Sequence, residues 1–121
     1  MFLATANKAQ RLLYLSYIGQ VSVADLERGY DDIKSILADF PAGFRLLADF
    51  SLLESVDIAC VDVIGRMMEL MDGHGLELIV RVVPDPSKDF GFKIIAIFHY
   101  SRNPRMIGCE TMQEAARALG L

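Results

Sequence analysis

The chain has 121 residues, which is enough for one domain, 1–121, to bury its own hydrophobic core. Hydrophobic residues make up 53 % of it and the formal net charge is −4; this composition predicts a buried sheet or a sizeable interface and argues against nucleic-acid binding, which needs clustered cations. The two cysteines lack CxxC spacing and no apolar run reaches the ~20 residues that span a bilayer, so we expect no disulfide framework, metal, cofactor or membrane span.

The first half of the chain predicts strands and one helix. Ser22 followed three residues later by Asp25 resembles a capping box with the shorter acid, which indicates where that helix begins. Asp49 falls at the carboxyl end of the last strand, where open α/β sheets place functional loops. The expected elements are a short strand at 2–5, a buried strand at 12–18, a helix from 23 to before Pro41, and a central strand at 44–50.

The second half alternates helices and strands. The segment 89–99 is ambiguous because its β-branched residues favour a strand while its large apolar residues also fit one helical face, and we favour a helix. Thr111 with Glu114 forms a capping box for the last helix. The expected elements are helices at 58–72, 90–100 and about 112–119, and strands at 76–83 and 105–109.

This alternation predicts an α/β fold. Strands separated by helices imply a mostly parallel sheet with crossover connections, and the two N-terminal strands are close enough to form an antiparallel hairpin. We therefore expect a four- to five-stranded sheet with about four helices.

The order of elements and several short strings resemble the STAS domains, the fold of bacterial anti-sigma-factor antagonists and of the cytoplasmic tails of sulfate transporters. The resemblance covers essentially the whole chain. The strings that carry it are Ile18-Gly19-Gln20, Leu46 to Phe50, Val56-Asp57-Ile58-Ala59-Cys60, Gly75 to Val82, and Cys109-Glu110-Thr111 with Glu114-Ala115-Ala116.

The resemblance implies regulation by phosphorylation of a serine or threonine just after a signature aspartate, because a helix N-terminus stabilises the added negative charge. Asp57 stands at that aspartate, but Ile58 and Ala59 occupy the hydroxyl positions and Cys60 replaces the family's glycine. Neither 58 nor 59 can accept a phosphoryl group, and Ser55 lies before the aspartate, on the expected loop. The resemblance still implies a partner-binding surface at this helix, formed by Asp57, Ile58, Ala59, Asp62, Arg66 and Glu69.

Each of two residues at this helix start could have either a chemical role or a purely structural one. Cys60 could be a reactive thiolate with a pKa lowered by the helix dipole, or it could pack on the apolar face with Ile64 and the methionines that follow; we favour packing. Asp57 could hold a ligand, or it could cap the helix, and we favour the cap. His99 could act as a base toward Ser101 or Cys60, but no nucleophile-elbow motif supports a catalytic group.

A second group of residues surrounds the apolar segment 90–100. Aromatic and polar side chains with a cationic border could bind a small apolar or lipid-like ligand, an anionic ligand or a lipid surface, or they could be core residues beside solvated cations. The residues of this group are Phe90, Phe92, Phe98, His99, Tyr100 and Arg102.

We therefore expect a non-enzymatic STAS-like module that binds a protein, such as an anti-sigma-factor-like regulator, or a second copy of itself. The alternatives are a carrier or sensor of a small apolar ligand and, at lower weight, a thiol-based sensor or enzyme that uses Cys60. The N-terminal residues do not combine a basic region, an apolar stretch and a cleavage site, so the expected location is the cytoplasm.

Overall fold

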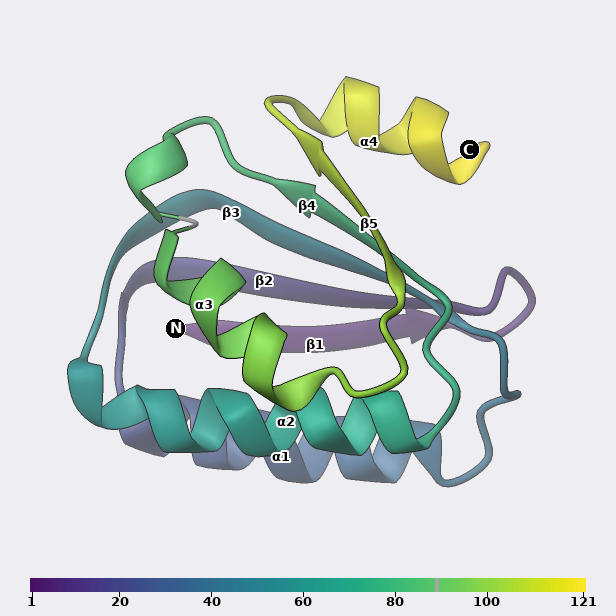
Figure 1. Ribbon diagram of the computed structural model, residues 1–121, viewed down its shortest axis with the longest axis horizontal. Helices are drawn as coiled ribbons and strands as arrows, with labels where there is room; N and C mark the ends of the chain where they lie inside the picture. The colour runs from purple at the N-terminus through teal and green to yellow at the C-terminus, as the bar shows by residue number, and fades with distance from the viewer. Residues whose placement is uncertain (89) are drawn as a thin grey trace.

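The computed structural model describes residues 1–88 and 90–121, with the side chain of Phe90 left aside. Five strands form one sheet in the order β1-β2-β3-β4-β5, in which β1 is antiparallel to β2 and every other pair is parallel (Figure 1). The predicted mixed α/β sheet is confirmed. The strands are β1 (Phe2–Asn7), β2 (Leu12–Val21), β3 (Arg45–Val56), β4 (Leu78–Val82) and β5 (Arg105–Cys109).

Four α-helices and two short 3-10 turns complete the described part of the chain. The helices are α1 (Val23–Leu37), α2 (Val61–Gly73), α3 (Phe90–His99) and α4 (Met112–Leu119), and the turns are η1 (Ile58–Cys60) and η2 (Pro86–Lys88). The helix favoured for the ambiguous segment is confirmed by α3. No helix in the described ranges is both long and apolar enough to cross a bilayer.

The predicted capping box of the first helix is confirmed. Ser22 Oγ accepts a hydrogen bond from the Asp25 N–H at 3.1 Å, and Asp25 Oδ2 accepts one from the Ser22 N–H at 3.0 Å. Two N–H groups that the helix cannot satisfy internally are therefore satisfied by these side chains. Behind this start, Leu26, Ile33 and Leu37 face the sheet at helical spacing and are buried.

The third strand differs from its prediction. It continues past Phe50 to Val56 because β2 pairs with it along its whole length, from Leu12 opposite Arg45 to Val21 opposite Val56. Asp49 thus lies inside the strand rather than at its end, and Ser55 belongs to the strand rather than to a loop. The carboxylate of Asp49 is buried and accepts hydrogen bonds from the Tyr14 hydroxyl at 3.1 Å and the Ser51 N–H at 2.9 Å.

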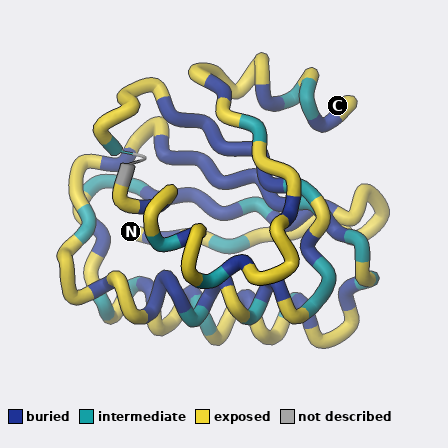
Figure 2. The backbone as a smooth tube through the Cα atoms, in the orientation of Figure 1, coloured by how far each residue is buried: buried dark blue, intermediate teal, exposed yellow. Residues whose placement is uncertain are grey.

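The helices lie on both faces of the sheet. Side chains of α1, α2 and α3 share the larger hydrophobic core with one face, whereas α4 packs through Ala115 and Leu119 on the other face at β4 and β5. Figure 2 shows that buried residues follow the strands and the sheet-facing sides of α1 and α2, while the outer side of α3 is exposed. The outer side of α3 and the start of α2 are therefore open to contact.

Candidate functional site

The start of α2 is formed by a tight turn. The second helix was predicted to begin at Ile58, but residues 58–60 form the 3-10 turn η1 and the α-helix begins at Val61. Asp57 Oδ1 accepts a hydrogen bond from the Ala59 N–H at 3.0 Å, which confirms the predicted capping role. Ile58 projects from this turn with 86 % of its surface exposed, the largest exposed fraction among the large hydrophobic residues described.

The six residues of the expected partner surface are brought to one side of α2, but they are not equally available. Ala59 and Asp62 are exposed beside Ile58. Arg66 donates to Glu27 Oε1 of α1 at 2.5 Å, and its guanidinium lies 5.2 Å from the ring centre of Tyr30. Glu69 bonds to His99 Nδ1 of α3 at 2.8 Å. The first turn of the surface is therefore open, whereas Arg66 and Glu69 connect α2 to its neighbouring helices.

A groove of about 420 Å³ runs beside this first turn, between the end of β3 and the start of α3. Its apolar walls come from Leu53 and Val56 of β3, Ile58 and Val61 at the helix start, and Ile95 of α3. Lys88 forms one rim and donates from Nζ to the backbone oxygen of Glu54. The sequence did not indicate this groove, because α3 follows β3 by more than thirty residues.

The structure separates the six residues that the sequence grouped as a ligand site. Phe92 and Tyr100 point into the core, Phe98 faces solvent with 77 % of its surface exposed, and Arg102 is exposed in the turn after α3. The side chain of Phe90 lies outside the described part of the chain. Among the predicted residues whose side chains the structure describes, only Phe92 and Tyr100 could line an internal site together.

No catalytic pairing forms at His99. Its Nδ1 bonds to Glu69, whereas Ser101 Oγ donates to Asp72 Oδ2 at 2.9 Å. The His99 ring instead occupies the space above Gly65, where a Cβ atom would lie 2.6 Å from Nε2. His99 therefore holds α3 on α2. In the described ranges, no three His, Cys, Asp or Glu residues are grouped as metal ligands would be.

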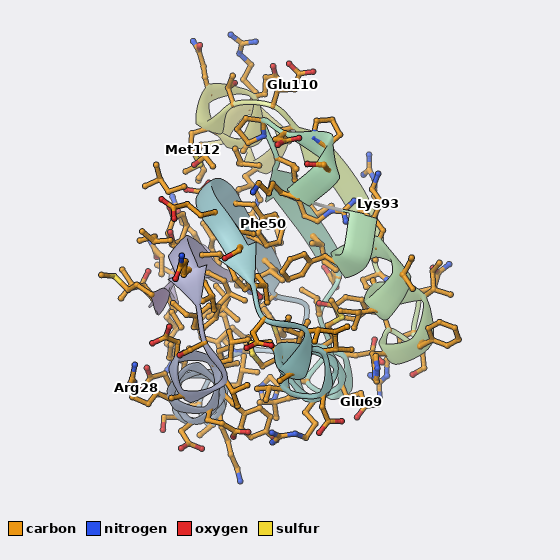
Figure 3. All side chains as sticks on the ribbon, turned by 90° about the vertical axis from the view of Figure 1, so that its left-hand side faces the viewer. Arg28, Phe50, Glu69, Lys93, Glu110 and Met112 are labelled. Carbon is orange, nitrogen blue, oxygen red and sulfur yellow. The ribbon has the colours of Figure 1, made fainter. Side chains whose placement is uncertain are left out.

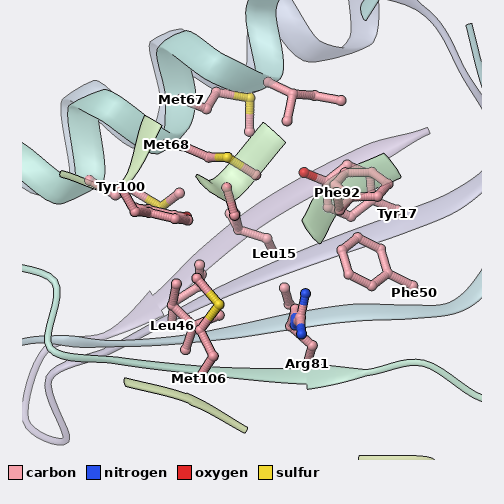
Figure 4. A pocket seen from close by; sticks show the side chains of 15 residues that line it. Leu15, Tyr17, Leu46, Phe50, Met67, Met68, Arg81, Phe92, Tyr100 and Met106 are labelled. Carbon is pink, nitrogen blue, oxygen red and sulfur yellow. The ribbon is translucent and has the colours of Figure 1, made fainter. Parts of the chain in front are cut away.

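Phe92 and Tyr100 line a cavity of about 40 Å³ between α2, α3 and the sheet. Figure 4 shows its wall, in which the rings of Tyr17, Phe50 and Phe92 lie together and the side chain of Arg81 points toward them. Burial raises the pKa values of the Tyr17 and Tyr100 hydroxyls far above their usual range, so both stay neutral. The methionines of the wall are Met67, Met68, Met71 and Met106.

Arg81 is the charged residue of this wall, and sequence reasoning missed it. It lies in the mostly apolar string LELIVRVV, and that string predicted only a strand. In the structure the residue is buried with 9 % of its surface exposed. The signal was present, since a cation inside an otherwise apolar parallel strand requires a specific environment.

Cys60 is a core residue. It is completely buried, and its Sγ lies 3.7 Å from the backbone oxygen of Val21. Burial and the nearby Asp57 carboxylate raise the pKa of the thiol, so the alternative of a dipole-activated thiolate is wrong. Burial likewise raises the pKa of Cys109, and both thiols remain protonated at neutral pH.

We therefore expect slow alkylation of the folded protein. In a Cys109→Ser variant, which leaves Cys60 as the single thiol, iodoacetamide should react far more slowly between pH 7 and pH 9 than with the same variant in guanidinium chloride. The raised pKa shifts the rise of the rate to higher pH than the ordinary value of about 8.5. A folded thiol that reacts faster at pH 7 than the unfolded one would contradict this result.

Comparison with solved structures identifies the fold of the chain. No family model matches the chain, and no curated protein matches it. Among solved structures, a protein of the DUF3478 family with a SpoIIAA-like fold from Shewanella loihica PV-4 aligns with a TM-score of 0.72 at 13 % identity, over 98 % of this chain and 92 % of that one. The chain has the SpoIIAA-like fold of the STAS domains.

Two further structures with the SpoIIAA-like fold are anti-sigma factor antagonists. SpoIIAA in its unphosphorylated form aligns with a TM-score of 0.65 at 19 % identity over the whole of both chains. An anti-sigma factor antagonist from Mycobacterium paratuberculosis aligns with a TM-score of 0.59 at 16 % identity, over 100 % of this chain and 94 % of that one. These likenesses agree with the fold that the resemblance in the sequence implied.

Proposed function

We propose that this chain is a non-enzymatic regulatory module that binds a protein partner through the first turn of α2, in the cytoplasm, without phosphorylation at the usual place. The observation that carries the proposal is the helix start itself. Asp57 caps it at the position of the family's signature aspartate, while Ile58, where a hydroxyl residue is expected, is 86 % exposed. The turn offers an apolar contact where the family offers a phosphate acceptor.

The surroundings of Ile58 support a protein contact. The side chain borders the 420 Å³ groove, and Val61, one turn along, is 43 % exposed beside it. Fully burying such a side chain contributes about 1.5–3 kcal/mol, and protein interfaces typically have an apolar core surrounded by a polar rim. Asp57 and Asp62 supply that polar border. The natural partner would be a regulatory protein of the anti-sigma-factor class.

The proposal predicts that a charge at position 58 prevents binding. Once the partner has been captured from the native cell and purified, Ile58→Asp should weaken its affinity at least tenfold by isothermal titration calorimetry, because a carboxylate would be desolvated in the interface. Stability should change little, since the residue is exposed.

The matched control is Leu52→Asp, which places the same charge at an apolar residue of β3 that is 63 % exposed. Equal loss of affinity in both variants, or no loss in either, would contradict the proposed surface. Stoichiometric phosphorylation of Ser55 in protein from the native cell would overturn the claim that the module works without phosphorylation.

A second candidate function is the carriage or sensing of a small apolar ligand. The cavity under α3 supports it, because its wall consists of aromatic, methionine and aliphatic side chains together with Arg81. A volume of about 40 Å³ holds only a few water molecules, so a larger ligand requires α3 to move from the sheet. Native mass spectrometry of freshly purified protein should then show a bound mass, and a clean protein mass would contradict this function.

A further inference from the structure

The outer side of α3 is apolar, as is the side that faces the core. Phe92, Ala96 and Tyr100 are buried against the sheet, yet Ile97 and Phe98 on the opposite side are each 77 % exposed and Ile94 is 42 % exposed. A surface helix normally shows charged and polar residues on its outer face. Three large apolar side chains on a ten-residue helix therefore indicate a contact surface.

This helix is bordered by positive charge in a chain that is acidic as a whole. Residues 84–105 contain four of the 12 Lys and Arg residues and two of the 16 Asp and Glu residues, although the net charge of the chain is −4. Of these cations, Lys93, Arg102 and Arg105 are exposed. Figure 3 shows Lys93 on the side of the molecule that α3 forms. Arg102 and Arg105 form no ion pair with any residue in the ranges 1–88 and 90–121.

Recesses lie on both sides of α3. The groove beside the start of α2 reaches Ile95, and a second groove of about 370 Å³ lies between α3 and the segment that leads into β5. In the second groove, Ile97 and Met106 supply apolar surface, and Lys93 and the Asn103 amide supply polar groups. Apolar side chains and carboxylates of one ligand could both be received there.

We propose that α3 is a second interaction surface, which binds an acidic amphipathic segment of a protein partner. Apolar side chains of that segment would pack on Ile94, Ile97 and Phe98, and its flanking carboxylates would lie near Lys93, Arg102 and Arg105. The inference shares with the proposed function that the chain binds a protein, and one of its two recesses is the groove that Ile58 borders. It does not require that the contact at Ile58 exists.

Two other occupants fit the surface less well. A second copy docked through the same face would form a two-fold interface and bring the cations of one copy against those of the other. Helices that lie on membranes carry several cations on their polar face, whereas α3 carries Lys93 as its single lysine or arginine, and the chain as a whole is acidic. Grooves on both sides also favour a ligand with defined side chains.

The test uses a pair of designed peptides and the full chain. One is an amphipathic helical peptide with Leu at positions i, i+3, i+4 and i+7 flanked by Glu, and the other has Lys in place of each Glu. Fluorescence anisotropy should show binding of the Glu peptide that is about tenfold or more tighter than that of the Lys peptide, and the difference should shrink as salt is raised. Equal binding of the two peptides, or binding of neither, would overturn the proposal.

Variants assign the contact to α3. Ile97→Asp with Phe98→Asp should abolish binding of the Glu peptide, whereas Leu52→Asp on β3 should retain it. The Ile58→Asp variant separates the two proposals. If it still binds the Glu peptide, the α3 surface acts independently of Ile58. If it loses peptide binding while the Ile97→Asp, Phe98→Asp variant retains it, the proposed α3 surface is wrong and the proposed function is unaffected.

The alternative occupants are tested with the same proteins. Vesicles of phosphatidylglycerol and phosphatidylcholine that bind the wild-type chain but not the α3 variant, in the absence of peptide discrimination, would identify a membrane surface and overturn the proposal. If the wild-type chain sediments as a dimer and the α3 variant as a monomer, α3 is an interface with a second copy and the proposal is wrong.

Discussion

Replacing Phe50 by alanine should lower the free energy of unfolding by about 3–5 kcal/mol, as is usual when a buried aromatic side chain is removed and the cavity does not close. The Phe50 ring lies 4.8 Å from that of Tyr17 and 4.5 Å from that of Phe92, measured between centroids. It thus connects β2, β3 and α3 in one cluster. The loss should be seen as a lower midpoint of urea unfolding with a nearly unchanged slope.

The control for this change lies two residues along the same strand. Leu52→Ala should alter stability by less than about 0.5 kcal/mol, because Leu52 is 63 % exposed. Hydrogen exchange should also be faster in α3 of the Phe50 variant, since that helix loses its contact with the sheet. Similar effects of the two substitutions would contradict the assignment of Phe50 to the core.

Replacing Asp72 by alanine should have the next largest effect, a loss of about 2 kcal/mol. The carboxylate is buried in the last turn of α2 and accepts hydrogen bonds from the Ser101 N–H at 3.1 Å, the Ser101 hydroxyl at 2.9 Å and the Arg102 N–H at 3.3 Å. Hydrogen bonds to a charged group contribute about 1.5–3 kcal/mol, and the exposed Ser101 and Arg102 regain part of this from water. The turn that connects α3 to β5 is held to α2 by these bonds.

Two comparison variants separate this role from the charge itself. Asp72→Asn should lose less than Asp72→Ala, because the amide oxygen can still accept from Ser101 while the unfavourable charge at the helix C-terminus is removed. Asp62→Ala, an exposed acid of the same helix, should change stability by no more than about 0.5 kcal/mol. Thermal unfolding of the three variants checks this order, and equal losses for Asp62 and Asp72 would contradict it.

Most of the fold could be predicted because its signals are local in the sequence. The capping residues Ser22, Asp57 and Thr111 act within three residues of themselves, and the structure shows each in that role. The cap at Thr111 differs from the predicted capping box in one bond. Thr111 Oγ1 accepts from the Glu114 N–H as predicted, but the Glu114 carboxylate accepts from the N–H of Glu110 rather than from that of Thr111. The alternation of strands and helices then led to the parallel sheet.

The candidate site was predicted less completely, because burial depends on segments that are distant in the sequence. The same pattern placed Phe92 and Phe98 in one group, and only the packing of α3 on the sheet decided that the first is buried and the second exposed. Cys60 has the position of a dipole-activated thiol in the sequence. In the structure, its burial against α1 and Val21 of β2 and the nearby Asp57 carboxylate raise its pKa instead.

The sequence by itself determined the α/β class, the helix starts and the missing hydroxyl residues after Asp57, since these follow from residue types and their spacing. The tertiary structure decided which side chains face the core along β3. A bulge opposite Ser16 and Ile18 shifts the alternation of the strand, so Phe50 and Leu53 both point inward. The tertiary structure also brought α3 beside the start of α2, because contacts between segments more than thirty residues apart are set by sheet pairing and helix packing.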